Sequence, residues 1–250
     1  MKKDLPYQKV NIFRWENNQK KELSDLVIRE SRLKLILNNK KLISLLYNGE
    51  DADYLGIGFL YSSGFLKEKE DIYSVVVNEE EEAIEIKAKN MENIPPLSEG
   101  FTPPNLVPQI IGRGTFPVEY KIIFKLMNDL QEKAELFQLT GGTHSCALAD
   151  MAGSIILFTE DISRYNTVDK ILGEAFIKQI SLEDKIILTS CRITSGIFTK
   201  IAVGKVPIIV SRAAPTDKTV QLAQKTGITL MGFVRGERMN IYSYPERIKF

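Results

Sequence analysis

The sequence is poor in the residues that form metal sites and disulfides. Its 250 residues include one histidine, His144, and two cysteines, Cys146 and Cys191. Two cysteines cannot build the disulfide framework of a small secreted domain. The His-x-Glu and Pro-Cys-x-x-Cys patterns of zinc deaminases are missing, and one histidine with two distant cysteines has poor spacing for a metal. We therefore expect no metal site.

Long hydrophobic runs and an excess of charge of one sign are also missing. The longest apolar runs, such as "SIILF" and "VPIIV", are far shorter than the ~18 residues of a membrane-spanning helix. No secretory hydrophobic region follows "MKKDLPYQKV". The net charge of +1 argues against general binding to nucleic acid or to membranes, so any anion site must be built locally. We expect a cytoplasmic protein with neither kind of partner.

The common catalytic signatures do not occur either. The sequence contains no Walker P-loop, no G-x-G-x-x-G, no G-x-S-x-G and no H-E-x-x-H. Nucleotide binding by those loops and catalysis by those motifs are therefore excluded. The function has to be argued from other patterns.

The chain divides into three parts by local pattern. Residues 1–95 form a strand-rich N-terminal lobe in our prediction, with a hairpin at Asn38–Asn39 and a short packed helix in "DADYLGIGFLYSSGFL". Residues 96–116 are rich in proline and glycine and form a loop between the two lobes. Residues 117–250 carry a long helix, with Pro117 in its first turn and apolar residues as far as Phe137.

After that helix, apolar strands alternate with helices. "SIILF", "DKIILT", "VPIIV" and "ITLMGFV" are the predicted strands, and helices separate them. Such alternation is typical of an α/β layer built on a largely parallel sheet.

Three of these strands end in a serine and an arginine directly before a helix. The pairs are Ser163 with Arg164, Ser190 with Arg192, and Ser211 with Arg212. The carboxyl ends of strands and the amino ends of helices are favourable places for anions, and the arginine fork matches phosphate. The pattern predicts a polyanion cradle, to which Lys170, Lys200 and Arg235 add charge. The alternative is that the serines are ordinary helix caps and the arginines ordinary surface residues.

The stretch "LTGGTHSCAL" admits several interpretations. Gly141 and Gly142 suit a helix C-cap or a loop that touches a ligand. His144 is either a ligand contact or a structural hydrogen-bonding residue. Cys146 would share a strand face with His144, so a Cys/His pair is conceivable, although no third orienting residue is evident. The simpler interpretation makes Cys146 a small buried hydrophobe.

These motifs together resemble the formate dehydrogenase accessory family of FdhD/NarQ type. The resemblance rests on "LTGGTHSCAL", "EDISRYNTVDKILGEA", "TSCRITSGIFTKIA" and "VPIIVSRAAPTDKTVQLAQKTGITLMGFVRGERMNIYS", and it covers most of residues 25–243. It implies a cytidine-deaminase-like three-layer α/β core with a smaller strand-rich lobe, usually as a homodimer. It also implies that sulfur passes from a cysteine desulfurase to the bis-molybdopterin guanine dinucleotide cofactor of formate dehydrogenase.

The resemblance supplies a set of cofactor-binding residues, for which GDP would be a partial mimic of the ligand. The set is Thr140, Gly141, Gly142, His144, Asp161, Arg164, Asn166, Asp169, Lys170, Ser190, Arg192, Lys200, Ser211, Arg212, Pro215, Thr216 and Arg235.

One segment departs from the family pattern. Members typically carry C-G-x-C-G before the long helix as the sulfur carrier, whereas this chain has Ile111 and Gly114 at the cysteine positions. Neither residue can hold a persulfide, so three hypotheses remain. The protein handles the cofactor without sulfur transfer; or it transfers sulfur through Cys191 or Cys146 as the catalytic thiol; or it is a hydrolase or deaminase, which the absence of metal ligands disfavours. Cys191 stands beside Arg192 at a predicted helix start, which leads us to expect a lowered thiol pKa.

Overall fold

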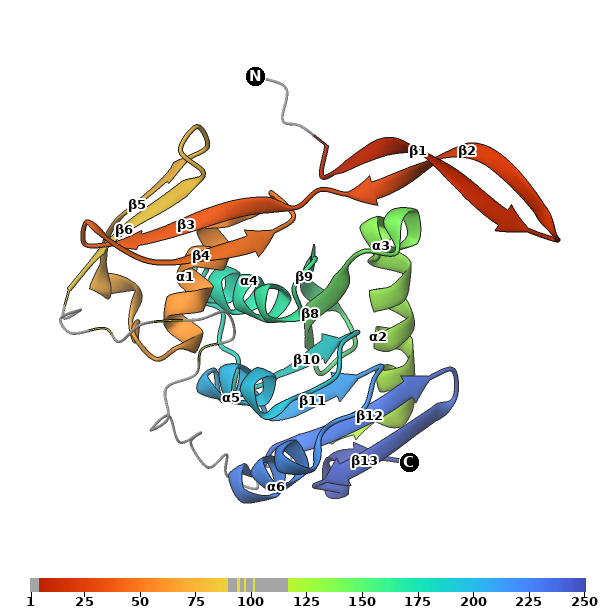
Figure 1. Ribbon diagram of the computed structural model, residues 1–250. Helices are drawn as coiled ribbons and strands as arrows, with labels where there is room; N and C mark the ends of the chain where they lie inside the picture. Colours follow the sequence, from red (N-terminus) through yellow and green to blue (C-terminus); the bar gives the residue numbers. More distant parts are fainter. Residues whose placement is uncertain (1–4, 90–93, 95–96, 98–100, 102–116) are drawn as a thin grey trace.

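The computed structural model describes residues 5–89, 94, 97, 101 and 117–250. Figure 1 shows a small sheet with one helix, a larger sheet with helices on both faces, and a two-stranded ribbon that projects away from both. Most of the predicted 96–116 loop, including Ile111 and Gly114, lies outside the described residues. No helix in the described ranges is long and apolar enough to cross a bilayer.

The small sheet is built from two hairpins and covered by one helix. Its order is β4-β3-β6-β5. The elements are β3 (Ser31–Leu37), β4 (Lys40–Tyr47), α1 (Ala52–Ser62), a 3-10 turn η1 (Lys69–Asp71), β5 (Ile72–Asn78) and β6 (Ala83–Ala88). The predicted hairpin at Asn38 and Asn39 is present, and both residues have the positive φ of a two-residue turn. The predicted helix is α1, whose apolar side chains pack on this sheet.

The projecting ribbon was not identified from the sequence. It consists of β1 (Tyr7–Glu16) and β2 (Gln19–Ile28), which pair along their whole length. Asn17 and Asn18 form its turn with φ of 50° and 62°. The same Asn-Asn signal that marks the β3–β4 hairpin was therefore available here.

The larger sheet is mixed rather than largely parallel. Its order is β13-β12-β11-β10-β8-β9, and only the β10–β11 and β11–β12 pairings are parallel. The strands are β8 (His144–Asp150), β9 (Ile155–Asp161), β10 (Lys185–Thr189), β11 (Ile208–Ser211), β12 (Thr229–Arg235) and β13 (Arg238–Ser243). The prediction of a largely parallel sheet was wrong because β8–β9 and β12–β13 are joined by tight turns, which only antiparallel neighbours allow.

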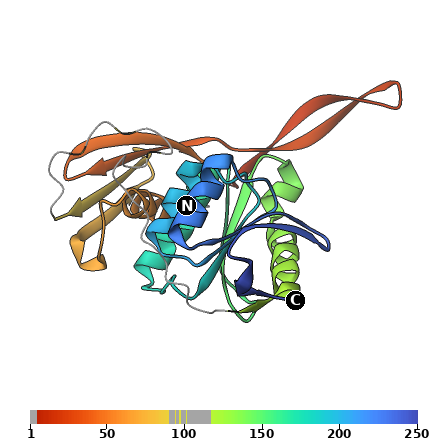
Figure 2. The same cartoon turned by 90° about the horizontal axis from the view of Figure 1, so that it is seen from below.

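Helices cover both faces of this sheet and make three layers. One face packs on α2 (Tyr120–Lys133), and the other on α4 (Arg164–Ile177), α5 (Ser195–Val203) and α6 (Asp217–Thr226). Along β8, Cys146 and Leu148 face the α4 side, whereas Ala147 and Ala149 face α2. Figure 2 shows α2 and the small sheet on opposite sides of the larger sheet. The likeness to cytidine deaminases stays a prediction.

The predicted long helix is two helices with a strand before them. Pro117 precedes β7 (Val118–Glu119), which pairs with β14 (Ile248–Lys249) near the end of the chain after a short turn η2 (Pro245–Arg247). The helix α2 ends at Lys133, the following Ala134 has a ψ of 63° that interrupts the helical path, and α3 (Glu135–Thr140) follows. Pro117 is therefore not in a helical first turn, because its neighbours are used for this strand pairing.

The small sheet and the larger sheet are joined through a close crossing of α1 and α4. A Cβ on Gly58 would lie 1.7 Å from the backbone oxygen of Asp169, and one on Gly173 would lie 2.0 Å from the oxygen of Tyr54. Any side chain at these positions would separate the two helices. The backbones therefore touch, and polar residues of the N-terminal lobe lie directly beside α4.

Candidate functional site

The predicted strand ends do lie together, at the end of the larger sheet where β9, β10 and β11 finish and β8 begins. His144 at the start of β8 pairs with Asp161 at the end of β9, and Thr189 at the end of β10 pairs with Ser211 at the end of β11. Cys146 pairs with Thr189 and so connects these two halves of the sheet end. The amino ends of α4, α5 and α6 follow directly. We call this end of the sheet the strand-end cradle, defined by residues 140–144, 161–164, 189–195 and 211–216 together with Arg235.

Four arginines of the strand-end cradle have no carboxylate partner among the described residues. Arg164, Arg192 and Arg235 are exposed and Arg212 is half-buried. In the described part of the chain, none of the four guanidinium groups forms an ion pair with a carboxylate. Arg235 is held toward Arg212, because its Nε donates to the Arg212 carbonyl at 3.1 Å. The cradle therefore concentrates unpaired positive charge at three helix amino ends, the arrangement that phosphate prefers.

The Nε of Arg212 gives a specific test of whether an anion fits. This nitrogen is buried and has no hydrogen-bond partner among the described residues. A buried donor without an acceptor costs roughly 1–3 kcal/mol, and more when the group is charged. A phosphate oxygen beside Arg212 would supply the acceptor, so the residues present fit a phosphorylated ligand.

Two of the three motif serines, Ser190 and Ser211, hydrogen-bond one loop to another. The Ser190 hydroxyl accepts from the Ser145 amide at 2.9 Å, and the Ser211 hydroxyl donates to the Cys191 carbonyl at 2.7 Å. Ser211 also accepts from the Ala213 amide at 2.9 Å and is fully buried. Thr216 caps α6, and its oxygen lies 2.8 Å from that of Thr219. These contacts fix the loop paths that present Arg192 and Arg212.

The glycine loop begins as a helix cap, one of the two predicted roles. Gly141 has φ of 66° and closes α3, with its amide donating to the Phe137 carbonyl at 2.8 Å. The Thr140 hydroxyl donates to the Leu136 carbonyl and accepts from the Gly142 amide. Gly141 and Gly142 are exposed, so a ligand can approach their backbone closely, although both amides already donate within the loop.

Glu160 holds this loop in place from β9. Its carboxylate accepts from the amides of Leu136 and Phe137 at 2.8 and 2.9 Å. It also accepts from the Thr143 hydroxyl at 2.8 Å. A carboxylate at the amino end of α3 is favourable for the helix dipole. Glu160 therefore fixes the approach of the glycine loop to His144.

His144 is half-buried and lies between groups of opposite charge. Desolvation by burial lowers the pKa of His144 below its ordinary value, Arg164 lowers it further, and Asp161 opposes both effects. The imidazole is therefore neutral at pH 7 and can donate one hydrogen bond to an anion without being a cation itself.

Five predicted cofactor ligands are instead buried in two ionic clusters beneath the strand-end cradle. They are Asp161, Asn166, Asp169, Lys170 and Lys200, each with at most 1% of its surface exposed. Their placement overturns the expectation that Lys170 and Lys200 add free charge to the cradle, because both ammonium groups already have partners inside the protein. Charged side chains this deeply buried must be paired, and these are.

The first cluster joins the small sheet to α4. Lys170 forms an ion pair with Asp161 at 2.7 Å and donates to Asn48 Oδ1 at 2.8 Å. Asn166 Nδ2 donates to Asp161 Oδ1 at 2.9 Å and to the Leu46 carbonyl at 2.7 Å. Asp161 also accepts from the Ser163 amide, so the cluster fixes the turn that presents Arg164.

The second cluster joins α1, α4 and α5. Lys200 donates to both carboxylate oxygens of Asp169 at 2.9 and 3.0 Å and to the Ser62 hydroxyl at 2.8 Å. Ser62 in turn donates to Asp169 at 2.6 Å. Sequence reasoning missed Ser62 and Asn48, since an isolated serine or asparagine in the N-terminal lobe gives no signal of a partner in α4 or α5.

Both cysteine side chains are buried, that of Cys191 within a loop of the strand-end cradle and that of Cys146 on the neighbouring strand β8. Cys146 is fully buried and Cys191 is 3% exposed. Burial raises the pKa of Cys146 well above its ordinary value, and Cys191 nearby raises it further. Burial also raises the pKa of Cys191, although a hydrogen bond from Thr189 and the charge of Arg164 oppose this. The expectation of a lowered Cys191 pKa was wrong because desolvation outweighs the neighbouring cation.

We expect both thiols to react slowly with alkylating reagents at pH 7. A buried protonated thiol reacts only when the protein opens, so labelling by iodoacetamide should be at least ~100-fold slower than for a free cysteine. Mass spectrometry of the intact protein over time measures this, and the denatured protein is the control that should label fully. Rapid labelling of folded protein at Cys191 would show an activated thiol and contradict the expectation.

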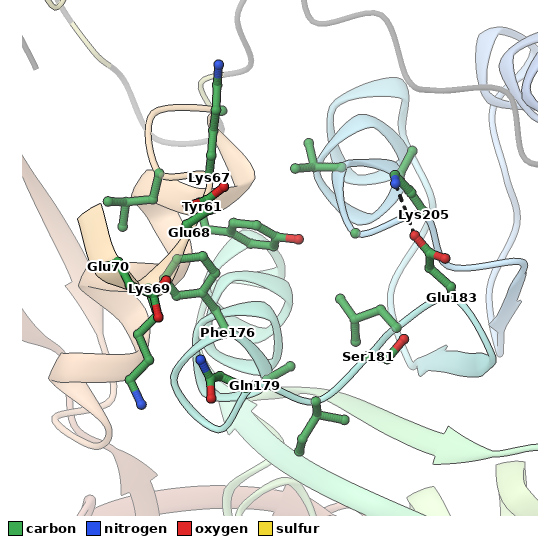
Figure 3. Close-up of a pocket in the computed structure, with 18 residues that line it drawn as sticks. Tyr61, Lys67, Glu68, Lys69, Glu70, Phe176, Gln179, Ser181, Glu183 and Lys205 are labelled. Atoms are coloured by element: carbon green, nitrogen blue, oxygen red, sulfur yellow. Dashed lines mark hydrogen bonds and ion pairs between the residues drawn. The ribbon is translucent and has the colours of Figure 1, made fainter. Parts of the chain in front are cut away.

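A separate cavity lies at the carboxyl ends of α1, α4 and α5. It has a volume of about 800 Å³ and is lined by Tyr61, Phe176 and the Lys205–Glu183 ion pair, among others. Figure 3 shows the Tyr61 and Phe176 rings side by side at its wall. Because α4 starts at the strand-end cradle and ends at this cavity, the two are separated by the length of that helix. None of the Ser/Arg loop residues lines it.

Comparisons with known proteins agree with one another. The model of the FdhD/NarQ family matches residues 28–249. The chain is 33% identical to the sulfur carrier protein FdhD of Wolinella succinogenes, over 91% of this chain and 84% of that one. It is 32% identical to the FdhD of Listeria monocytogenes serotype 4b, over 98% of both chains. A crystal structure of a candidate formate dehydrogenase accessory protein from Desulfotalea psychrophila superposes with a TM-score of 0.87 at 26% identity, covering 98% of this chain and all of that one.

Proposed function

Because this chain belongs to the FdhD/NarQ family, we propose that it is an accessory protein of formate dehydrogenase that supports sulfuration or insertion of the molybdenum cofactor. The cofactor, bis-molybdopterin guanine dinucleotide, is the cargo, and its guanosine diphosphate portion docks on the strand-end cradle. The observation that carries the proposal is the buried Nε of Arg212, which has no acceptor among the described residues, beside three further arginines that have no carboxylate partner there. Formate dehydrogenase, a cysteine desulfurase and a second copy of the chain are the proposed partners, in the cytoplasm.

The cradle residues divide into two groups with different roles. The arginines Arg164, Arg192, Arg212 and Arg235 would bind the phosphates, and the open backbone of Gly141 and Gly142 with the neutral His144 would contact the rest of the nucleotide. Thr140, Ser190, Ser211, Pro215 and Thr216 shape the loops that carry these groups. The buried clusters around Asp161 and Asp169 hold those loops against the N-terminal lobe without touching the ligand.

We favour a role in which this chain binds or helps to insert the cofactor without passing sulfur through a cysteine of its own. Positions Ile111 and Gly114 have no sulfur, and the two cysteines are buried with raised pKa values. A sulfurtransferase that uses Cys191 or Cys146 is the alternative, since both lie beside the cradle. The test is incubation with a cysteine desulfurase and cysteine, followed by intact mass. We expect no gain of a sulfur atom, whereas a persulfide on either cysteine would establish the alternative.

Cofactor binding is tested with GDP by calorimetry. We expect saturable binding with a dissociation constant of about 1 μM or lower. Guanosine, which lacks the phosphates, should bind far more weakly because the arginines would have no anion to contact. Absence of GDP binding at high micromolar concentration would contradict the proposed cradle.

The single histidine provides a second readout of the same site. A folded-state pKa below the unfolded value of about 6.5 means that the unfolded chain binds more protons. The contribution of His144 to stability is therefore present above about pH 6.5 and is lost as the pH falls below it. We expect NMR titration to give the lowered pKa directly, and GDP to raise it because an anion favours imidazolium. A pKa above 6.5 in the free protein would contradict the described surroundings of His144, and the variant His144→Gln is the control for the stability change.

A further inference from the structure

The β1–β2 ribbon is a sheet of two strands with no third strand beside it in the described part of the chain. An isolated two-stranded hairpin is at best marginally stable in water. This one also exposes large apolar side chains, with Phe13 63%, Trp15 69% and Val27 41% exposed. Figure 1 shows it projecting from the body of the molecule. Both its length and its exposed aromatics call for a structure that covers it.

The outer edge of β1 is the edge open to pairing. The Arg29 amide donates to the Pro6 carbonyl at 2.7 Å, in the same register that pairs Glu16 with Gln19 across the turn. Even-numbered residues of β1 therefore bond to β2, and the odd-numbered ones direct their N–H and C=O groups outward. The base of β2 instead lies against the α3 region, where Ile28 contacts Gly142. Within β1 itself no proline blocks the outward edge.

We propose that β1 pairs antiparallel with β1 of a second copy of this chain, around a two-fold axis at Asn11. In an antiparallel pair, two facing residues either exchange backbone hydrogen bonds with each other or both point these groups away. An odd-numbered residue of one β1 must therefore face an odd-numbered residue of the other, and an even-numbered residue must face an even-numbered one. The axis at Asn11 then sets Tyr7 opposite Trp15 and Lys9 opposite Phe13 on one face. The two hairpins become one four-stranded sheet, with the closed symmetry typical of homodimers.

The side chains favour this register over its neighbours. Centred on Asn11, Val10 faces Ile12 on the second face, and no two like charges meet. Tyr7 opposite Trp15 is an aromatic pair, and Lys9 opposite Phe13 brings a cation to an aromatic ring. Both kinds of cross-strand contact stabilise paired strands. Centring on Ile12 instead places Val10 opposite Arg14, and centring on Val10 leaves Trp15 beyond the paired region. The self-complementary pattern is the reason to name a second copy as the occupant.

This pairing identifies the surface of the homodimer that the proposed function includes, but it does not depend on cofactor binding. Trp15 is the only tryptophan in the chain, so its fluorescence reports on the ribbon alone. We expect sedimentation at micromolar concentration to show a dimer, and dilution to shift Trp15 emission to the red as the dimer separates. GDP titration of the same samples tests the cradle separately, so failure of one proposal is distinguishable from failure of the other.

Two variants make the test specific to β1. Asn11→Pro removes an outward N–H that the hairpin does not use, and Phe13→Ser removes an aromatic ring without changing charge. Each should raise the dimer dissociation constant at least about tenfold. Tyr73→Ser is the matched control, because Tyr73 is a 70% exposed aromatic on another strand, β5, and should leave the dimer unchanged.

Three outcomes would overturn the proposal. A wild-type protein that stays monomeric up to about 100 μM would show that a second copy does not cover the ribbon. A dimer that forms equally well with Asn11→Pro and Phe13→Ser would place the interface elsewhere. Open-ended oligomers would show a contact without two-fold symmetry. Circular dichroism of each variant confirms that its fold is intact.

Discussion

Replacing Arg212 with alanine is expected to weaken GDP binding about 10- to 100-fold, the value of one charge-assisted hydrogen bond or two. Arg212 is the cradle arginine whose buried Nε finds no acceptor in the described ranges, so a phosphate there replaces no described contact of that nitrogen. Its loop is fixed independently, because Ser211 and the Ala213 amide carry the hydrogen bonds that shape it. The variant should therefore lose affinity while keeping its thermal stability. Calorimetry with GDP and a melting curve measure both.

The control for this variant is Arg32→Ala. Arg32 is an exposed arginine on β3, in the N-terminal lobe and outside the strand-end cradle, so its removal changes net charge equally. GDP affinity should be unchanged within about twofold. An equal loss in both variants would mean that GDP responds only to the overall charge of the protein. No loss in Arg212→Ala would remove Arg212 from the phosphate site.

Replacing Lys200 with methionine is expected to destabilise the protein by roughly 3–5 kcal/mol. The substitution leaves the Asp169 carboxylate fully buried with its main cationic partner gone. The Ser62 hydroxyl still hydrogen-bonds Asp169 across the α1–α4–α5 junction, but it supplies no positive charge. Chemical denaturation followed by circular dichroism measures the free energy of unfolding. A direct ligand role for Lys200 would instead lower GDP affinity with little change in stability.

Lys205→Met is the matched control, since it removes the same charge near the end of the same helix. Lys205 pairs with Glu183 at 3.0 Å, but both side chains are exposed. Exposed pairs contribute about 0–1 kcal/mol, so the control should be nearly neutral. The double variant Asp169→Leu with Lys200→Met removes both buried charges and should recover part of the lost stability. A large loss in the control, or none in Lys200→Met, would contradict the role of burial.

The strand-end cradle could be predicted because its signals are local. A strand followed by serine, arginine and a helix is a short pattern, and the carboxyl ends of parallel strands meet at one edge regardless of what lies far away. Thr189 and Ser211 meet at this edge in the parallel pairing of β10 and β11, as this pattern requires. The glycine loop was also readable, since Gly141 closes α3 with the positive φ that glycine allows.

The buried clusters could not be predicted, because their partners are distant in sequence. Lys170 meets Asn48 across 122 residues, and Lys200 meets Ser62 across 138. A lysine after a strand end is usually exposed, so a free positive charge was the natural expectation. The close crossing of α1 and α4 encloses both lysines and turns them from ligand candidates into structural ones.

The sequence by itself determined the family, most strands and helices, and the row of arginines at the sheet edge, since each depends on neighbours within one segment. Only the tertiary structure decided which charges remain open to a ligand. In the part of the chain that the structure describes, Arg212 keeps a buried donor without an acceptor, whereas Lys170 and Lys200 form ion pairs. Both thiols are desolvated rather than activated. The reason is that solvation and ion pairing are set by what the fold brings alongside a group, and that information lies in the contacts between segments.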